Sequence, residues 1–435
     1  MIFIYFYLLL IYKMAETATQ LLNYNDKAMR GVSSRAYRTK TNPSNGQNFS
    51  MGQTINLDLP SGQMRTFFDF GNSYLRLNLA NSDTTDITLE GGNGILNLIK
   101  KVEIVVSGQT ISSIDNYNIL CDMLLDLDSS DDFKNNTGAL LMGTGSGDKF
   151  DKGITMGENT NQNFAFPLLL TPLFNSSKYI PAFSSDSIRI RITLNTSASA
   201  VICEATGITD AQLTISDVEL VMYNVELSAD AFNLVDESVN GVYDIVVDDY
   251  RSASSQVASG DSTSNSVLGF SFSSLNRVFV AFRPQDTLSA DTKCSTNRAR
   301  ADLTEINLLK NGESIPARPI KVSADASEVM AELLVADRGM GVFSHSGSMG
   351  EAEFRLTNPT GGDGDVGTFM VCLDTESMRS AENKVYTGVN SIGSVVALEC
   401  KYDTVPDAME INVFAQYTLS LSLDTRGTNT FVVAL

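Results

Sequence analysis

Ile99-Lys-Lys-Val-Glu-Ile-Val-Val-Ser-Gly-Gln-Thr-Ile111 and Leu303-Thr-Glu-Ile-Asn-Leu-Leu-Lys-Asn-Gly-Glu-Ser-Ile315 share one pattern, in which an apolar strand runs into a glycine turn and a second strand. The same offset of 204 residues aligns Asn72 with Asn276 and places the segment 73–79 over 277–283. Two further matches, 123–128 with 332–337 and 223–227 with 417–421, have offsets of 209 and 194. The chain therefore contains the same unit twice, and the second copy has about ten fewer net loop residues.

Alternation of apolar and polar residues predicts that both copies are built from β-strands. In Ser187-Ile-Arg-Ile-Arg-Ile-Thr-Leu194 the isoleucines and Leu194 face one way and the arginines and Thr193 the other, the two-residue period of a half-buried strand. The other predicted strands are 55–59, 74–79, 101–106, 212–215 and 218–227 in the first copy, and 242–247, 277–282, 305–309, 353–356, 368–373, 394–402 and 410–423 in the second. Short strands with few helices between them indicate an all-β sandwich or barrel.

The helical pattern is confined to a few places. The segments 116–127 and 327–335 are the strongest helix predictions, and they fall at equivalent points of the two copies. A cluster of Asp, Ser and Asn at 229–240 follows a strand and predicts the boundary between the copies. Each copy then has about 180 to 200 residues, which is enough for an eight-stranded jelly roll with one helix and one long loop.

Four passages resemble the double jelly-roll major capsid proteins of icosahedral double-stranded DNA viruses, the lineage of adenovirus hexon, tailless membrane-containing phages and polinton-like viruses. They are 68–77, 99–111 with 115–120, 166–173 with 178–181, and 188–194. The resemblance covers most of 50–435, but the long tower insertions of the large members are absent. It implies an all-β fold of two tandem eight-stranded jelly rolls with few short helices, at 51–235 and 236–435, after an N-terminal segment and arm at 1–50.

The resemblance implies a structural protein of the virion. Three chains with two barrels each would form a homotrimeric, pseudo-hexagonal capsomer that tiles the facets of an icosahedral shell, assembled inside the host cell. Its partners would be its own copies, neighbouring capsomers, and minor capsid or penton proteins. The alternative is a two-domain β-sandwich surface or spike protein that binds a receptor or glycan. Two barrels of the same topology side by side would favour the capsid interpretation.

The charge of the chain is unevenly distributed. The formal net charge is −20, yet residues 14–50 carry five basic side chains against two acidic ones. An acidic body argues against a surface that coats nucleic acid, because phosphate binding needs clustered Lys and Arg. The resemblance implies that 14–50 is an extended, inward-facing arm that contacts minor proteins, an inner membrane or the packaged genome; a solvated tail is the other interpretation. Its expected contact residues are Lys27, Arg30, Arg35, Arg38 and Lys40.

The first thirteen residues contain an apolar run at 2–12. This run is shorter than the ~20 residues that span a bilayer, and it lacks the basic leader and small-residue cleavage site of a signal peptide. The expected explanation is an upstream start codon ahead of a start at Met14, and a membrane-touching N-terminus is the alternative.

The residue inventory predicts no catalysis, no cofactor and no metal. His345 is the only histidine, and Gly143-Thr-Gly-Ser-Gly-Asp-Lys149 lacks the spacing of a phosphate loop, so a surface loop is expected there. The acidic run 126–132 and the pair Asp363 and Asp365 offer carboxylates to Ca²⁺ but lack an EF-hand pattern, so solvated side chains are expected. The five scattered cysteines form no Cys-x-x-Cys pair and are expected to be buried thiols of a reducing compartment.

Overall fold

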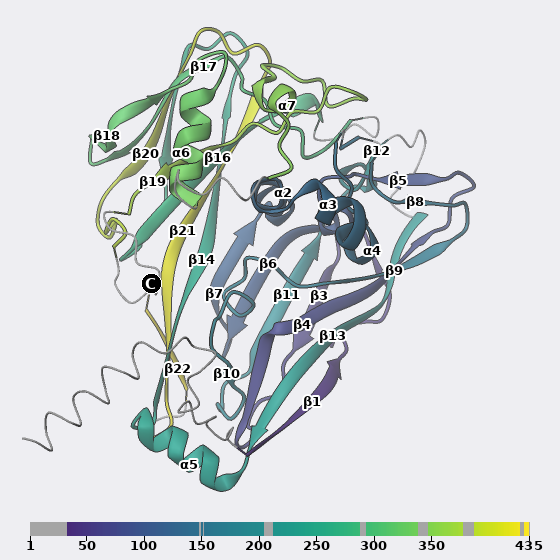
Figure 1. Ribbon diagram of the computed structural model, residues 1–435, viewed down its shortest axis with the longest axis vertical. Helices are drawn as coiled ribbons and strands as arrows, with labels where there is room; N and C mark the ends of the chain where they lie inside the picture. Colours follow the sequence, from purple (N-terminus) through teal and green to yellow (C-terminus); the bar gives the residue numbers. More distant parts are fainter. Residues whose placement is uncertain are drawn as a thin grey trace, which may run out of the picture.

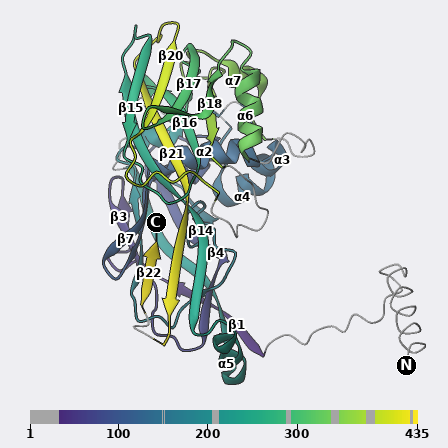
Figure 2. The same cartoon turned by 90° about the vertical axis from the view of Figure 1, so that its left-hand side faces the viewer.

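The computed structural model describes residues 33–147, 149–150, 152–203, 212–287, 293–337, 347–376, 387–426 and 430–434. These residues form two antiparallel β units that pack against each other, the second at the upper left and the first at the lower right of Figure 1, with short helices between and beside them. The view turned by 90° shows the same two units and places β1 and helix α5 at the same end (Figure 2).

The first unit has two main sheets. One has the order β1-β13-β4-β10, with β2 beside β13 and β9 beside β4, and the other has the order β3-β11-β6-β7. Their strands are β1 (Ser34–Thr41), β2 (Phe49–Ser50), β3 (Thr54–Asp58), β4 (Thr66–Asn81), β6 (Ile99–Val106), β7 (Gln109–Asp115), β9 (Asn161–Phe166), β10 (Ile180–Pro181), β11 (Ile188–Leu194) and β13 (Leu213–Leu227). A small third sheet, β12-β5-β8, contains β5 (Ile87–Leu89), β8 (Thr155–Met156) and β12 (Ile202–Cys203).

The second unit also has two sheets. The orders are β14-β21-β16-β19, with β22 beside β21, and β15-β20-β17-β18. The strands are β14 (Val242–Val257), β15 (Thr263–Leu268), β16 (Leu275–Pro284), β17 (Leu303–Lys310), β18 (Glu313–Lys321), β19 (Val371–Asp374), β20 (Val396–Tyr402), β21 (Met409–Asp424) and β22 (Phe431–Ala434).

The two units share one strand topology. β14, β21, β16 and β19 take the places of β1, β13, β4 and β10, and β15, β20, β17 and β18 take the places of β3, β11, β6 and β7. When these eight strands of a unit are numbered in chain order, the first, eighth, third and sixth form one sheet. The second, seventh, fourth and fifth form the other. This is the eight-stranded jelly roll. The predicted fold class, two tandem jelly rolls, is confirmed.

The aligned glycines of the two copies close the same kind of hairpin. Two residues separate β6 from β7 and β17 from β18, and all four have positive φ: Ser107 (+47°), Gly108 (+83°), Asn311 (+52°) and Gly312 (+85°). Two consecutive positive φ angles define a type I′ turn, whose twist matches that of the flanking strands. The offset of 204 residues thus reports an equivalent hairpin in each jelly roll.

The two predicted helices lie at equivalent places, as expected. Helix α2 (Tyr117–Asp128) follows β7, and helix α6 (Ser327–Asp337) follows β18. The remaining helical segments of the first jelly roll are η2 (Gly94–Leu98), α3 (Asp131–Phe133), the π-helical turn η3 (Lys134–Gly138), α4 (Ala139–Met142) and η4 (Ala198–Ala200). In the second jelly roll, η6 covers Gln285–Thr287.

Two segments differ from the sequence-based expectation. The predicted boundary 229–240 is largely helix α5 (Ala229–Ser238), whose first turn is capped by the Ser228 hydroxyl, which accepts a bond from the Ala231 amide at 3.3 Å. The polar residues at the start of this segment cap helix α5, which connects β13 to β14. The predicted strand 353–356 is wrong, because these residues belong mainly to helix α7 (Glu351–Arg355). Phe354 alone is buried there, and Glu351 pairs with Arg355 one turn on.

The core of the protein runs through both jelly rolls. The alternation in β11 is confirmed, since its isoleucines and Leu194 are buried while its arginines are half-buried. One continuous cluster of buried apolar side chains includes Leu57 of the first jelly roll and Leu421 of the second. All five cysteines are buried, as expected, and none forms a disulfide. Because the apolar core is shared, the two jelly rolls pack as one body.

Candidate assembly surfaces and the junction of the jelly rolls

Charged side chains gather where the two jelly rolls meet. Helix α2 presents Asp122 and Asp126 on one face, because residues four apart on a helix are neighbours. Lys134 comes from η3, Lys149 from the loop that leads to β8, and Arg298 from the segment before β17 in the second jelly roll. None of these five side chains is more than 5% exposed.

The contacts within this cluster are direct ion pairs. Lys134 Nζ and Lys149 Nζ each lie 2.6 Å from an oxygen of Asp126, and Arg298 pairs with the same carboxylate. Asp122 Oδ2 lies 2.6 Å from Lys149 Nζ and 3.1 Å from Arg298 Nη1. Burial alone would raise the pKa of Asp126, but the three neighbouring cations together lower it well below its usual range. The cluster therefore brings the carboxyl groups of Asp122 and Asp126 together with three cations.

Two expectations for these segments are wrong. Asp126, placed in a solvated acidic run with possible Ca²⁺ ligands, is buried, and both of its oxygens are taken by cations of the protein. The glycine-rich loop that ends at Lys149 is not a surface loop, since residues 143–145 and Lys149 are buried. A Cβ at Gly145 would collide with the Lys152 carbonyl, which explains the glycine there. Close packing, not phosphate binding, accounts for the composition of this loop.

A second polar contact across the junction is made by Glu90. Its Oε2 accepts bonds from the Ser295 amide (3.1 Å) and hydroxyl (2.9 Å), and its Oε1 accepts bonds from the Thr296 amide (3.0 Å) and hydroxyl. Glu90 follows β5, whereas Ser295 and Thr296 precede β17. The buried carboxylate of one jelly roll thus receives four hydrogen bonds from the other, which compensates for its desolvation.

The adjoining strands β7 and β14 form a third polar contact. The Ser112 hydroxyl donates to Asp249 Oδ1 at 2.8 Å, and the Tyr417 hydroxyl donates to Asp249 Oδ2 at 2.6 Å. Nearby, Asn116 Nδ2 donates to Asn412 Oδ1 at 2.7 Å. Burial raises the pKa of Asp249 to about 6, although the bonds from Tyr417 and Ser112 act in the opposite direction. Ionisation of Asp249 is therefore less favourable in the folded protein than in water.

The predicted arm residues are only partly covered by the structure. Lys27 and Arg30 lie outside the described residues, as does His345. Arg35, Arg38 and Lys40 lie in β1, which pairs with β13 along its whole length. Alternation along the strand places Arg38 and Lys40 on one face and Arg35 on the other.

The basic residues of β1 also differ in their contacts. Lys40 Nζ pairs with Glu219 Oε2 at 2.6 Å, and the Arg35 guanidinium lies 5.6 Å from the centre of the Tyr37 ring. Part of the predicted extended arm is thus an edge strand of the first jelly roll. Asp365, one of the discounted metal-ligand candidates, accepts bonds from the Thr360 amide and hydroxyl within its own loop.

Several large apolar side chains of the described residues are exposed, which sequence reasoning did not identify. Val267 in β15 is 74% exposed, and Ile392 and Val395, just before β20, are each 57% exposed. Val267 pairs with Ala397, which lies two residues beyond Val395 on the same face. Elsewhere, Leu140 of α4 (79%), Met64 (72%) and Leu234 of α5 (68%) are also exposed. Exposed apolar surface of this kind is typical of contacts between proteins.

Comparisons with known proteins bear on the fold. No family model and no curated protein sequence matches the chain. None of the helices in the described part of the chain is long and apolar enough to span a membrane.

Solved structures of viral capsid proteins, however, match over nearly the whole chain. PBCV-1 VP54, as fitted into a reconstruction of the virophage Sputnik, has a TM-score of 0.65 at 10% identity, covering 95% of this chain and 99% of that one. The Faustovirus major capsid protein has a TM-score of 0.62 at 12% identity, covering 93% of each chain. A chain of the Sputnik virophage has a TM-score of 0.61 at 11% identity, covering 96% of this chain and 92% of that one.

These likenesses establish the fold as the double jelly roll of such structures. The resemblance seen in the sequence is confirmed at this level.

Proposed function

We propose that this protein is the major capsid protein of an icosahedral double-stranded DNA virus and resides in the virion shell. The observation that carries the proposal is the pair of jelly rolls with identical strand topology, packed side by side in one chain. Similarity to solved capsid proteins over 93% or more of the chain supports it. The receptor- or glycan-binding alternative does not account for the repeated topology, and no structural neighbour favours it.

The working unit in this proposal is a homotrimer. Three chains contribute six similar barrels, and six barrels around one axis make a pseudo-hexagonal tile. A trimer that buries an extensive interface would be obligate, so little stable monomer is expected. Light scattering on a sizing column, with protein expressed from Met14, tests this. A mass near three times that of the chain (47.1 kDa), unchanged on dilution, is expected. A monomer that persists at high concentration would contradict the proposal.

We place one contact between copies at the apolar surface of Val267, Ile392 and Val395. Three large apolar side chains that are 57% exposed or more gain by being covered. Val267→Asp should therefore weaken the trimer or the association of trimers, measured by light scattering and by electron microscopy of assembled sheets. Thr263→Asp, which adds the same charge at another exposed position of β15, is the matched control. Equal behaviour of the two variants would show that this surface faces solvent.

The N-terminal segment is proposed to reach inward to minor capsid or penton proteins, to an inner membrane, or to the genome. Support comes from the basic residues Lys27, Arg30, Arg35, Arg38 and Lys40 in a chain whose net charge is −20. Arg38 is exposed on β1, whereas Lys40 is engaged by Glu219. Deleting residues 14–32 should leave the trimer intact and impair only later assembly. Loss of the trimer would instead make the segment part of the subunit interface.

A further inference from the structure

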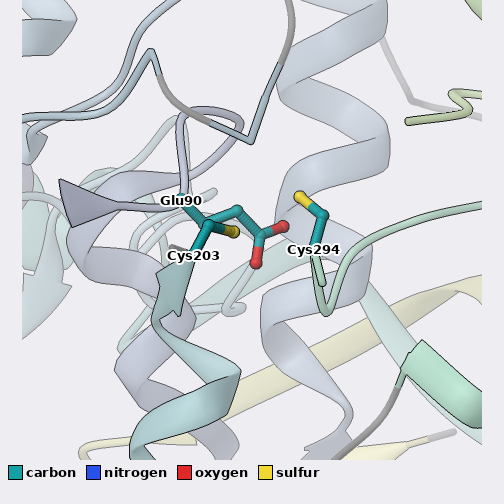
Figure 3. A group of neighbouring side chains, drawn as sticks. All are labelled: Glu90, Cys203 and Cys294. Atoms are coloured by element: carbon teal, nitrogen blue, oxygen red, sulfur yellow. The ribbon is translucent and has the colours of Figure 1, made fainter. Parts of the chain in front are cut away.

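Two cysteines from different jelly rolls meet a glutamate inside the junction (Figure 3). Glu90 follows β5, Cys203 ends β12, and Cys294 belongs to the segment that leads to β17. All three residues are 0% exposed, and their sulfur and carboxylate oxygen atoms lie within 4.8 Å of one another. Cys203 and Cys294 are 91 positions apart, so no sequence motif joins them.

Two thiols and a carboxylate form a donor set that suits Zn²⁺. Zinc bonds sulfur at ~2.3 Å and carboxylate oxygen at ~2.0–2.2 Å in a tetrahedron, so its ligand atoms lie roughly 3.5–3.8 Å from one another. The observed cluster, whose atoms lie within 4.8 Å of one another, needs to contract by about 1.0–1.3 Å at most to reach that spacing, which side-chain rotation can supply. Hard cations such as Ca²⁺ and Mg²⁺ prefer oxygen ligands and do not match two sulfurs.

The surroundings of the cluster can complete the coordination. Thr296 Oγ1 lies 3.9 Å from Cys294 Sγ and also donates to Glu90 Oε1. If this hydroxyl turns toward the ion, it becomes a fourth ligand and frees a lone pair of Glu90. The amides of Ser295 and Thr296, at 3.1 and 3.0 Å, continue to hold the carboxylate in place. Hydrogen bonds of this kind orient the ligands of protein metal sites.

The charges of the site are compatible with the ion. Without metal the Cys294 thiol is neutral, since burial raises its pKa well above the usual value and the neighbouring Cys203 and Glu90 raise it further. Zn²⁺ displaces both thiol protons, and the ion, two thiolates and one carboxylate then sum to −1. Arg283 offsets this charge, because its Nη2 donates to the Ser295 carbonyl at 2.6 Å, although it also pairs with Glu410.

We propose that Glu90, Cys203 and Cys294 form a Zn²⁺ site that fastens the second jelly roll to the first. Two ligands belong to the first jelly roll and one to the second, so the ion would add strong bonds across the junction. The site is independent of the capsid function proposed above, because it concerns contacts within one chain.

The test measures metal in the whole purified protein, expressed without a histidine tag in zinc-supplemented medium. Elemental analysis should find about one zinc per chain, because a buried site with thiolate ligands binds tightly. Cys203→Ser and Cys294→Ser should each reduce this content by more than tenfold. Cys400→Ser makes the same change at an equally buried thiol in β20 and should retain the metal. Replacing zinc by Co²⁺ should give thiolate-to-cobalt absorption in the wild type and the Cys400 variant alone.

Three outcomes would overturn the proposal. One is wild-type protein without bound zinc, also after refolding with Zn²⁺, and this measurement stands even if both cysteine variants fail to fold. The second is a disulfide between Cys203 and Cys294, seen by mass spectrometry without reductant, which would identify the pair as an oxidative link. The third is zinc that remains bound in both variants, which would place it elsewhere.

Discussion

Replacing Asp249 by asparagine should stabilise the protein at neutral and alkaline pH. Asp249 is 0% exposed and accepts hydrogen bonds from Ser112 and Tyr417. Burial raises its pKa from an ordinary 3.8 to about 6. The folded state therefore holds this proton more tightly than the unfolded chain does. Stability contributed by this group is complete below pH 4 and is lost as the pH rises through 6.

The expected size of the effect follows from the pKa. A rise of about two units corresponds to about 3 kcal/mol, at ~1.36 kcal/mol per unit. That is the free energy by which the ionised Asp249 carboxylate lowers stability at pH 8. Asparagine carries no charge, and the hydroxyls of Ser112 and Tyr417 can accept as well as donate, so both contacts can survive. The Asp249→Asn variant should thus exceed the wild type by up to about 3 kcal/mol at pH 8, and by progressively less toward pH 4.

Urea unfolding between pH 4 and pH 8 measures this difference. Far-ultraviolet circular dichroism is the appropriate signal because the chain has no tryptophan. All samples need one protein concentration, since dissociation of an oligomer contributes to apparent stability. Asp244→Asn, at an exposed position of the same strand, is the control and should leave the pH dependence unchanged. If the difference between Asp249→Asn and wild type is constant with pH, Asp249 does not titrate there and the argument fails.

Three further predictions concern other contacts. Asp126→Asn should lower the free energy of unfolding by ~3–5 kcal/mol, and by more than Arg298→Met does. The first change leaves three cations with Asp122 alone, whereas the second leaves two cations with two carboxylates. Equal losses of stability in urea unfolding would contradict this. Gly108→Ala and Gly312→Ala should each lower the free energy of unfolding by ~1–2 kcal/mol, measured by thermal unfolding, because both glycines have left-handed φ. Strongly unequal losses of stability would show that the two turns differ. Lys40→Ala should cost less than ~1 kcal/mol because its pair with Glu219 is partly exposed, and a double-mutant cycle with a coupling clearly above that value would refute it.

Much of the fold could be predicted from local patterns. The alternation in β11 and the glycine turns of the two copies have direct structural counterparts, because both patterns depend on neighbouring residues alone. The predicted strands 212–215 and 218–227 are one strand, β13, in which Asp217 (φ +51°) interrupts the register without ending the sheet. The sequence did not predict helix α7, because its short apolar pattern fits a strand equally well. The helix is favoured by the packing of Phe354, which a local pattern does not reveal.

The polar junction was harder to predict because its partners are distant in sequence. Asp126 and Arg298 are separated by 172 positions, and no local pattern relates them. One signal was available: Asp122 and Asp126 lie four residues apart in α2, among side chains that are buried on the same helix. Two acids on an apolar helix face predict buried cationic partners, although not which ones. The exposed Val267 of β15 and Val395, just before β20, carry no signal at all, since an outward apolar residue matches the strand pattern as well as an inward one.

The composition of the junction has a consequence for the proposed capsomer. Apolar surfaces can slide over one another at modest cost, whereas an ion pair displaced by a few ångströms leaves a buried charge without its partner. The bonds of Glu90 adjoin the Asp122–Asp126–Arg298 cluster, since Ser295 and Thr296 come just before Arg298 in the chain, and the bond of Ser112 to Asp249 joins β7 to β14. Contacts of this kind resist displacement of one jelly roll relative to the other. In the proposed capsomer, a junction that resists displacement would set the relative placement of the two barrels of each chain before any two chains meet.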